Sequence, residues 1–204
     1  MNDNLTEIVM IVDRSGSMSS ICSEAQVGFN EFIQKQKEVD GDVRITVTEF
    51  DSDIEILYDN EKIENIKEYK LLPRGMTALL DAIGFTINKV GNRLSETEDS
   101  ERPSKIMVCI ITDGQENSSI EYNKQQIKEM IEEQTNKYSW EFVFIGANMD
   151  AFAEASSIGI RHSASYDATG VGIRNAFTYS SDLTTSYRTT GSLDSTKSNV
   201  KLDS

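Results

Sequence analysis

The chain has 204 residues, which suits one domain with a full hydrophobic core, and it carries a net charge of −14 at pH 7. This acidic balance argues against nucleic-acid binding, which needs a basic patch, and fits solubility or a basic protein partner. No apolar run approaches the roughly 18 residues that span a bilayer, residues 1–7 have no basic n-region, and the 2 cysteines provide no disulfide framework. We therefore expect a cytoplasmic protein that neither enters a membrane nor binds nucleic acid.

The first half of the chain predicts a strand, a helix and a hairpin. Residues 7–12 form an unbroken apolar strand, and the apolar stripe of the following helix consists of Ile21, Ala25, Phe29, Phe32 and Ile33. Residues 43–50 alternate as a strand does, and residues 51–53 separate them from a second strand at 54–58. This connection is too short for a crossover, so the two strands should pair antiparallel, with the second at the edge of the sheet.

The second half alternates helices and strands. The predicted elements are a helix over 80–94, a buried strand over 105–112, a helix around 127–131, a strand over 140–146, a short helix capped by Asp150, a weak strand over 163–166 and a helix over 173–187. This order predicts an α/β fold: a doubly wound (Rossmann-like), mostly parallel sheet of six strands, with one antiparallel edge strand and helices on both faces. We assign residues 1–188 to this domain and expect residues 189–204, rich in small polar side chains, to form a flexible tail.

Asp13, Ser15 and Ser17 directly follow the first strand. Alternate residues of an extended chain face the same way, so these three side chains can converge on one point, and Gly16 lets the loop turn there. One carboxylate and two hydroxyls are hard oxygen ligands, which suit magnesium, manganese or calcium rather than zinc or copper.

Two further oxygen sources complete the pattern. Thr77 follows the turn-type stretch 73–76, and Asp113 ends the buried strand over 105–112 and precedes Gly114. Because open α/β sheets bind ligands at the carboxyl ends of their strands, Asp13 and Asp113 should lie on the same rim. Each aspartate alone is typical of a helix cap or a turn, but their joint placement indicates a metal site.

These three motifs, in this order, resemble the von Willebrand factor A domain family and its metal-ion-dependent adhesion site. The family pattern is Asp-x-Ser-x-Ser, then a lone Thr, then Asp-Gly, and each part has its counterpart in the residues above. The resemblance covers roughly residues 4–188 and is closest to the short, stand-alone members found in bacteria and their phages. Met76 departs from the pattern, since many relatives carry a small residue there.

The resemblance implies that one divalent ion, Mg²⁺ or alternatively Mn²⁺ or Ca²⁺, binds to five residues: Asp13, Ser15, Ser17, Thr77 and Asp113. Neutral hydroxyls bound directly, with the aspartates acting partly through water, leave such an ion with much of its charge, so it takes an Asp or Glu carboxylate of a partner protein. We expect a metal-dependent protein-binding module without turnover. The loop at residues 115–118 is expected to border the ion and to select the partner. The same is expected of Asp51 and Ser52 at the hairpin turn if the strand before them runs parallel to the first strand.

Other classes of function stay open. In a scaffold, assembly or virion component, the metal would only stabilise the loops. An aspartyl-nucleophile phosphotransferase of the haloacid dehalogenase type would use Asp13, but such enzymes need a carboxylate two residues later, where this chain has Ser15, and a lysine that we cannot place. A serine hydrolase is disfavoured because the single histidine, His162, belongs to a late, weak strand with no evident tie to Ser15 or Ser17.

Overall fold

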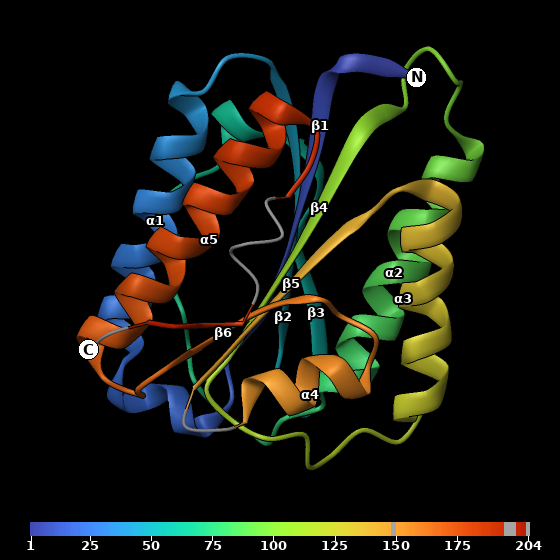
Figure 1. Ribbon diagram of the computed structural model, residues 1–204. Coiled ribbons are helices and arrows are strands. Elements are labelled where there is room, and N and C mark those ends of the chain that lie inside the picture. The colour runs from blue at the N-terminus through green and yellow to red at the C-terminus, as the bar shows by residue number, and fades with distance from the viewer. Residues whose placement is uncertain (148–149, 194–198, 203–204) are drawn as a thin grey trace.

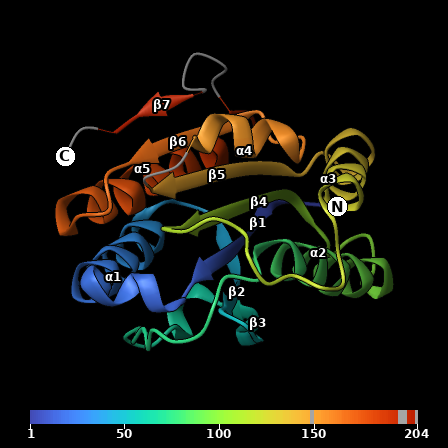
Figure 2. The ribbon, with the colours of Figure 1, turned by 90° about the horizontal axis from the view of Figure 1, so that it is seen from below.

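The computed structural model describes residues 1–147, 150–193 and 199–202 of the chain. Its centre is a 7-stranded sheet in the order β3-β2-β1-β4-β5-β6-β7, which Figure 2 shows from below, with β7 at the top and β3 at the bottom. The strands are β1 (Asn2–Asp13), β2 (Asp42–Phe50), β3 (Ile54–Lys62), β4 (Pro103–Thr112), β5 (Glu141–Ala147), β6 (His162–Tyr166) and β7 (Val200–Lys201). The β2–β3 pair is antiparallel and the other described pairs are parallel, which confirms the predicted mixed edge.

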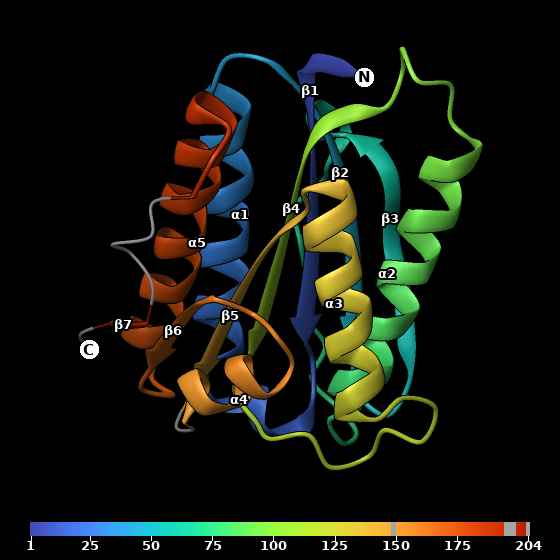
Figure 3. The same ribbon diagram turned by 45° about the vertical axis from the view of Figure 1, so that its right-hand side comes forward.

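Helices cover both faces of this sheet (Figure 1). The α-helices are α1 (Cys22–Glu38), α2 (Leu79–Glu96), α3 (Lys124–Tyr138), α4 (Ala151–Ser157) and α5 (Gly170–Thr190), and the short 3-10 helices are η1 (Gly16–Ser20) and η2 (Ile63–Asn65). On one face α1 and α5 lie side by side, and on the other α2 lies beside α3 (Figure 3). None of the helices in the described ranges is both long and apolar enough to cross a bilayer.

The central strand β1 is apolar at successive positions because both of its faces are buried. Its residues Ile8, Met10 and Val12 belong to the core beneath α1 and α5. Val9 and Ile11 belong to the second core, beneath α2, α3 and α4. This is the pattern expected of a parallel strand between two helical layers, and it places the end of β1 in the middle of the sheet.

The C-terminal part of the chain differs from the prediction. Six strands and a flexible tail from residue 189 were expected, but α5 continues to Thr190 and Val200–Lys201 forms a seventh strand beside β6. The tail contains just enough apolar side chains to bury, because Leu193, Val200 and Leu202 pack against the core beneath α1 and α5. The predicted boundary after residue 188 therefore falls inside α5, and residues 194–198 and 203–204 lie outside the described residues.

The architecture brings three strand ends together. β1 ends at Asp13, β2 at Phe50 and β4 at Thr112. Because the three strands are parallel neighbours, their carboxyl ends lie at the same end of the sheet. Asp13 pairs in register with Phe50. Loops that follow these strands therefore meet at one place, which is where a doubly wound fold binds its ligands.

Candidate metal centre

Asp13 is fully buried at the end of β1, and neutral groups satisfy its carboxylate. The Ser15 amide donates to Asp13 Oδ1 at 2.6 Å, and the Thr112 hydroxyl donates to Asp13 Oδ2 at 2.6 Å. Burial raises the pKa of Asp13 to about 6, against the opposing effect of the hydrogen bonds from Thr112 and Ser15. The site thus contains a buried carboxyl group whose charge no basic side chain of the described residues neutralises.

The two serines connect Asp13 to Asp113. Ser15 Oγ and Ser17 Oγ lie 2.9 Å apart, and Ser17 Oγ donates to Asp113 Oδ1 at 2.6 Å. Burial also raises the pKa of Asp113, while the Ser17 hydrogen bond lowers it. The loops after β1 and β4 therefore meet through a chain of hydroxyl and carboxylate oxygens, as the sequence predicted.

Thr77 reaches the same place from the loop before α2. A Cβ atom added to Gly114 would lie 3.4 Å from Thr77 Oγ1 and 3.7 Å from Ser17 Oγ, so both hydroxyls lie close to the backbone that follows Asp113. The backbone of Thr77 is held by one residue, since its amide donates to Asn117 Oδ1 at 2.9 Å and its carbonyl accepts from the Asn117 amide at 3.1 Å. All five residues predicted to bind the metal thus converge.

The chemistry of this donor set fits a small divalent ion. It consists of two carboxyl groups and three hydroxyls, all hard oxygen donors of the kind that bind Mg²⁺ or Mn²⁺. Within the described part of the chain, no three His, Cys, Asp or Glu side chains gather where they could hold an ion, so neither a zinc-type cluster nor a carboxylate-rich calcium cage competes with it. Burial disfavours the charged forms of Asp13 and Asp113, as their raised pKa values indicate, and a bound cation would favour those forms.

Glu116 and Asn117, in the loop after Asp113, form hydrogen bonds that stabilise neighbouring loops and that the sequence did not predict. The Glu116 carboxylate accepts hydrogen bonds from the amides of Leu80, Ser118 and Ser119, at 2.9, 2.8 and 2.7 Å, and from the Ser119 hydroxyl. It therefore caps the first turn of α2 and shapes its own loop, and Asn117 clasps Thr77. Both were expected to border the ion and contact a partner; their hydrogen bonds in the structure hold the Thr77 loop and the start of α2.

Arg14, between the candidate ligands Asp13 and Ser15, forms a network beside the site that the sequence analysis did not predict. Asp13 and Ser15 face the predicted site, so Arg14 between them turns to the other side, where its Nε donates to Asp51 Oδ2 at 2.8 Å. Its Nη1 donates to Glu49 Oε2 at 3.0 Å and to Glu55 Oε2 at 2.7 Å. The sequence did contain an indication of this role. Side chains of an extended chain alternate in direction, so Arg14 had to face the hairpin, where a buried cation needs acidic partners. Glu49, Asp51 and Glu55 flank the β2–β3 turn.

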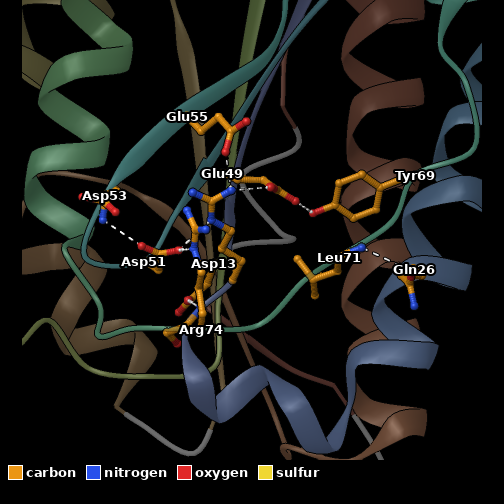
Figure 4. A network of polar contacts seen from close by, with 11 residues as sticks. Asp13, Gln26, Glu49, Asp51, Asp53, Glu55, Tyr69, Leu71 and Arg74 are labelled. Atoms are coloured by element: carbon orange, nitrogen blue, oxygen red, sulfur yellow. Dashed lines mark hydrogen bonds and ion pairs between the residues drawn. The ribbon is translucent and has the colours of Figure 1, made fainter.

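Figure 4 shows this network, with Asp51 and Glu55 at one end and Tyr69 at the other. Glu49 lies between the arginine and Tyr69, whose hydroxyl donates to Glu49 Oε1 at 2.5 Å, and Tyr69 stacks on Phe29 of α1. Arg74 Nε adds a second guanidinium to Asp51 Oδ2 at 2.9 Å. Burial by itself would raise the pKa of Asp51, but the Asp53 amide and the two arginines outweigh it and hold that pKa below its usual range.

His162 lies away from the serines. It opens β6, and the strand runs four residues further before Tyr166 reaches the edge of the sheet that carries Asp13. Four residues of strand span about 13 Å. The side chain is buried in this position. The arrangement therefore offers no nucleophile and base pair of the serine hydrolase type.

Comparisons with known proteins agree on the fold. No protein-family model matches the chain, and no curated protein matches it in sequence. Solved structures that are similar include the ArnB paralog VWA2 from Sulfolobus acidocaldarius (16% identity, TM-score 0.60, 90% of this chain) and a von Willebrand factor type A structure from Catenulispora acidiphila (12%, 0.61, 88%). Proximal thread matrix protein 1 from the mussel byssus, whose metal-ion-dependent adhesion site is occupied by zinc in one structure, is similar at 15% identity with a TM-score of 0.60 over 88% of this chain.

The chain spans 45%, 42% and 46% of the length of these three structures, so each of them contains more than this fold. The matches cover 88% to 90% of the present chain. At these identities the comparison concerns the fold alone. This chain has the fold of the von Willebrand factor type A domain.

Proposed function

We propose that this chain is a divalent-metal-dependent protein-binding module whose ion, Mg²⁺ in the first instance, binds to Asp13, Ser15, Ser17, Thr77 and Asp113. The observation that carries the proposal is the meeting of the buried Asp13 carboxyl group and the half-buried Asp113 carboxyl group with three hydroxyls, and without a basic side chain among the described residues. A cation is the missing partner, because uncompensated negative charge is costly to bury. The zinc found in the adhesion site of the mussel protein supports a divalent ion in a fold of this type.

The chain's own residues prepare this binding in distinct ways. Ser15, Ser17 and Thr77 present neutral oxygens, while Asp13 and Asp113 supply the charge that makes the site selective for cations. When bound, the ion supplies an electrophilic point that an Asp or Glu carboxylate of a partner protein can complete. With only two acidic ligands, the protein leaves much of the ion's charge to that partner.

We further propose that the module has no turnover of its own and works in the cytoplasm. Asp13 is held by the Ser15 amide and the Thr112 hydroxyl, and the position two residues later is a serine, so the carboxylate pair of an aspartyl phosphotransferase is incomplete. The distance of His162 from the sheet edge argues against acyl transfer. Free Cys22 and Cys109 fit a reducing compartment.

The test begins with the metal alone. Calorimetry on chelator-stripped protein with Mg²⁺, Mn²⁺, Ca²⁺ and Zn²⁺ should show one site that prefers Mg²⁺ or Mn²⁺, and Thr77→Ala should weaken it. Absence of binding at millimolar Mg²⁺ and Mn²⁺ would refute the metal site. Assays of phosphatase, nucleotidase and esterase activity with either ion should show none above background, and activity that disappears in Asp13→Asn at unchanged stability would move the chain into the enzyme class.

Partner capture separates adhesion from scaffolding. A protein that is captured in Mg²⁺, released by a chelator, displaced by excess free glutamate and not captured by Thr77→Ala would support recognition through the ion. A captured protein that stays bound after chelation would favour a scaffold or assembly component, in which the metal only stabilises the loops.

A further inference from the structure

The turn between β2 and β3 lies against the loop that carries Thr77. The carbonyl oxygen of Asp51 accepts a hydrogen bond from the Ala78 amide at 2.8 Å, and Ser52 Oγ accepts one from the Met76 amide at 3.0 Å. These bonds hold the residue on each side of Thr77. The turn therefore fixes the backbone from which the Thr77 hydroxyl extends toward the candidate metal centre.

The side chain of Asp51 joins the same loop to the loop after β1. The carboxylate is almost fully buried, and its Oδ1 accepts from the Asp53 amide at 2.8 Å, which shapes the turn. Its Oδ2 accepts from Arg14 Nε at 2.8 Å and from Arg74 Nε at 2.9 Å (Figure 4). Arg14 belongs to the loop of Asp13 and Ser15, and Arg74 to the loop of Thr77. One carboxylate thus connects two loops that supply metal ligands.

The two segments are also in close contact. Gly75 has a φ of +69°, and a Cβ atom there would lie 3.0 Å from Ser52 Oγ and 3.2 Å from Asp51 Cβ. The loop therefore lies directly on the turn, with no space for a side chain between them. A further bond from the Gly16 amide to the Gly75 carbonyl, at 3.2 Å, fastens the loop on its other side. Movement of the turn would therefore be transmitted to Thr77.

We propose that the Asp51–Ser52 turn is a positioning element of the candidate metal centre, which sets the place of the Thr77 hydroxyl without giving an atom to the ion. This inference rests on the proposed function and assigns a role to two residues that the sequence suggested only as a border of the site. Both Asp51 oxygens are already bonded, so the carboxylate supports ligands rather than acting as one. Substitution of groups that orient metal ligands commonly lowers metal affinity about 10-fold to 100-fold.

The experiment measures Mn²⁺ binding by calorimetry to the metal-stripped full chain. The variants are Asp51→Asn, which keeps the shape of the side chain but replaces an acceptor by a donor facing the arginines, and Ser52→Ala, which removes the hydroxyl that holds Met76. Ser52→Thr restores a hydroxyl. Glu55→Gln is the matched control, since Glu55 also pairs with Arg14 but its side chain is 54% exposed and has no bond to the Thr77 loop. Hydrogen exchange of the Met76 and Ala78 amides and denaturant unfolding are measured alongside.

We expect Asp51→Asn to weaken Mn²⁺ binding about 10-fold or more and Ser52→Ala to weaken it several-fold, with faster exchange of the two amides. Ser52→Thr and Glu55→Gln should bind within about twofold of the unchanged chain. Equal affinity of Asp51→Asn, Ser52→Ala and the unchanged chain would overturn the inference and leave the metal site in place. If Asp51→Asn does not fold, Ser52→Ala decides, because Ser52 is exposed. If the unchanged chain binds no Mn²⁺, the proposed function fails, whereas unaltered amide exchange in the variants would refute the turn's hold on the loop by itself.

Discussion

Two buried aspartates at neighbouring strand ends have opposite electrostatic surroundings. Asp51 directly follows β2, receives two guanidiniums and has a lowered pKa. Asp13 ends β1 opposite Phe50, the residue before Asp51, receives only an amide and a hydroxyl, and has its pKa raised to about 6 by burial. The protein therefore supplies cations of its own to the aspartate on the hairpin side, and no cation of the described residues to the aspartate on the serine side. This difference is the one expected if a cation from outside binds beside Asp13, as we propose.

The largest expected effect comes from substitution of Arg14, which removes the main cation on the hairpin side. Arg14→Met leaves Glu49 and Asp51 buried without their main cation, and such orphaned charges cost about 3 to 5 kcal/mol of unfolding free energy. Denaturant unfolding measures this. Arg174→Met is the matched control, because Arg174 also faces two carboxylates, those of Glu24 and Glu31, but at the surface. Its loss should cost less than about 1 kcal/mol. Equal costs for the two arginines would show that burial does not distinguish them.

Substitution of each aspartate by asparagine should have opposite effects on stability. In metal-free protein at pH 8, Asp13→Asn removes a buried, uncompensated charge, so we expect a gain of about 1 to 3 kcal/mol. The new amide can donate to Thr112 Oγ1, whose own hydrogen can turn to the Gly114 carbonyl at 3.0 Å. Asp51→Asn should instead destabilise, since it sets a donor against two guanidiniums. Unfolding of both variants decides the matter, and a loss of stability in Asp13→Asn similar to that in Asp51→Asn would contradict the comparison.

The fold could be predicted from the sequence because its signals are local. Unbroken apolar runs such as residues 8–12 predict strands that are buried on both faces, and the short 51–53 connection allows only a hairpin. The residues of the candidate metal centre could also be predicted, since Asp13, Thr77 and Asp113 each follow a strand or a turn. The seventh strand was not, because Val200 and Lys201 show no strand pattern of their own and gain order from pairing with β6.

The support of the site also escaped prediction, for a different physical reason. Arg14, Asp51 and Arg74 meet across separations of 23 to 37 residues, and no periodicity or spacing in the sequence indicates which acid a buried arginine selects. Glu116 and Asn117 lie in a polar stretch where exposed side chains are the ordinary expectation. Their bonds to the start of α2 and to Thr77 depend on the folded position of the loop.

The affinity for the metal should depend on pH because Asp13 takes up a proton, and not because of the carboxylate of Asp51, which is paired with arginines. The folded-state pKa of Asp13, about 6, lies above its ordinary value of 3.8, so the metal-free folded protein takes up a proton there as pH falls. A proton and a cation compete for this carboxylate. Mg²⁺ affinity should therefore be constant above about pH 7 and fall by up to about tenfold per pH unit below about pH 6. Because its pKa is higher in the folded than in the unfolded state, Asp13 stabilises the metal-free folded protein at low pH, and this contribution to stability is lost as pH rises through about 6. Calorimetry between pH 5 and 8 checks this, and constant affinity across the range would contradict it.

The smallest expected effect comes from the second arginine on Asp51. Arg74 and Arg14 donate to the same oxygen, Asp51 Oδ2, at 2.9 and 2.8 Å, but their side chains are 60% and 6% exposed. Water already solvates Arg74, so Arg74→Met should lower the unfolding free energy by only about 0.5 kcal/mol, and the loss should shrink further in high salt. Arg14→Met, by contrast, should keep most of its cost in salt, because its partners are shielded from solvent ions. Paired unfolding measurements of the two variants at low and high ionic strength make the comparison on a single carboxylate. A salt-insensitive loss of 2 kcal/mol or more in Arg74→Met would show that the buried Asp51 carboxylate needs both guanidiniums, and that Arg14 alone is not a sufficient partner.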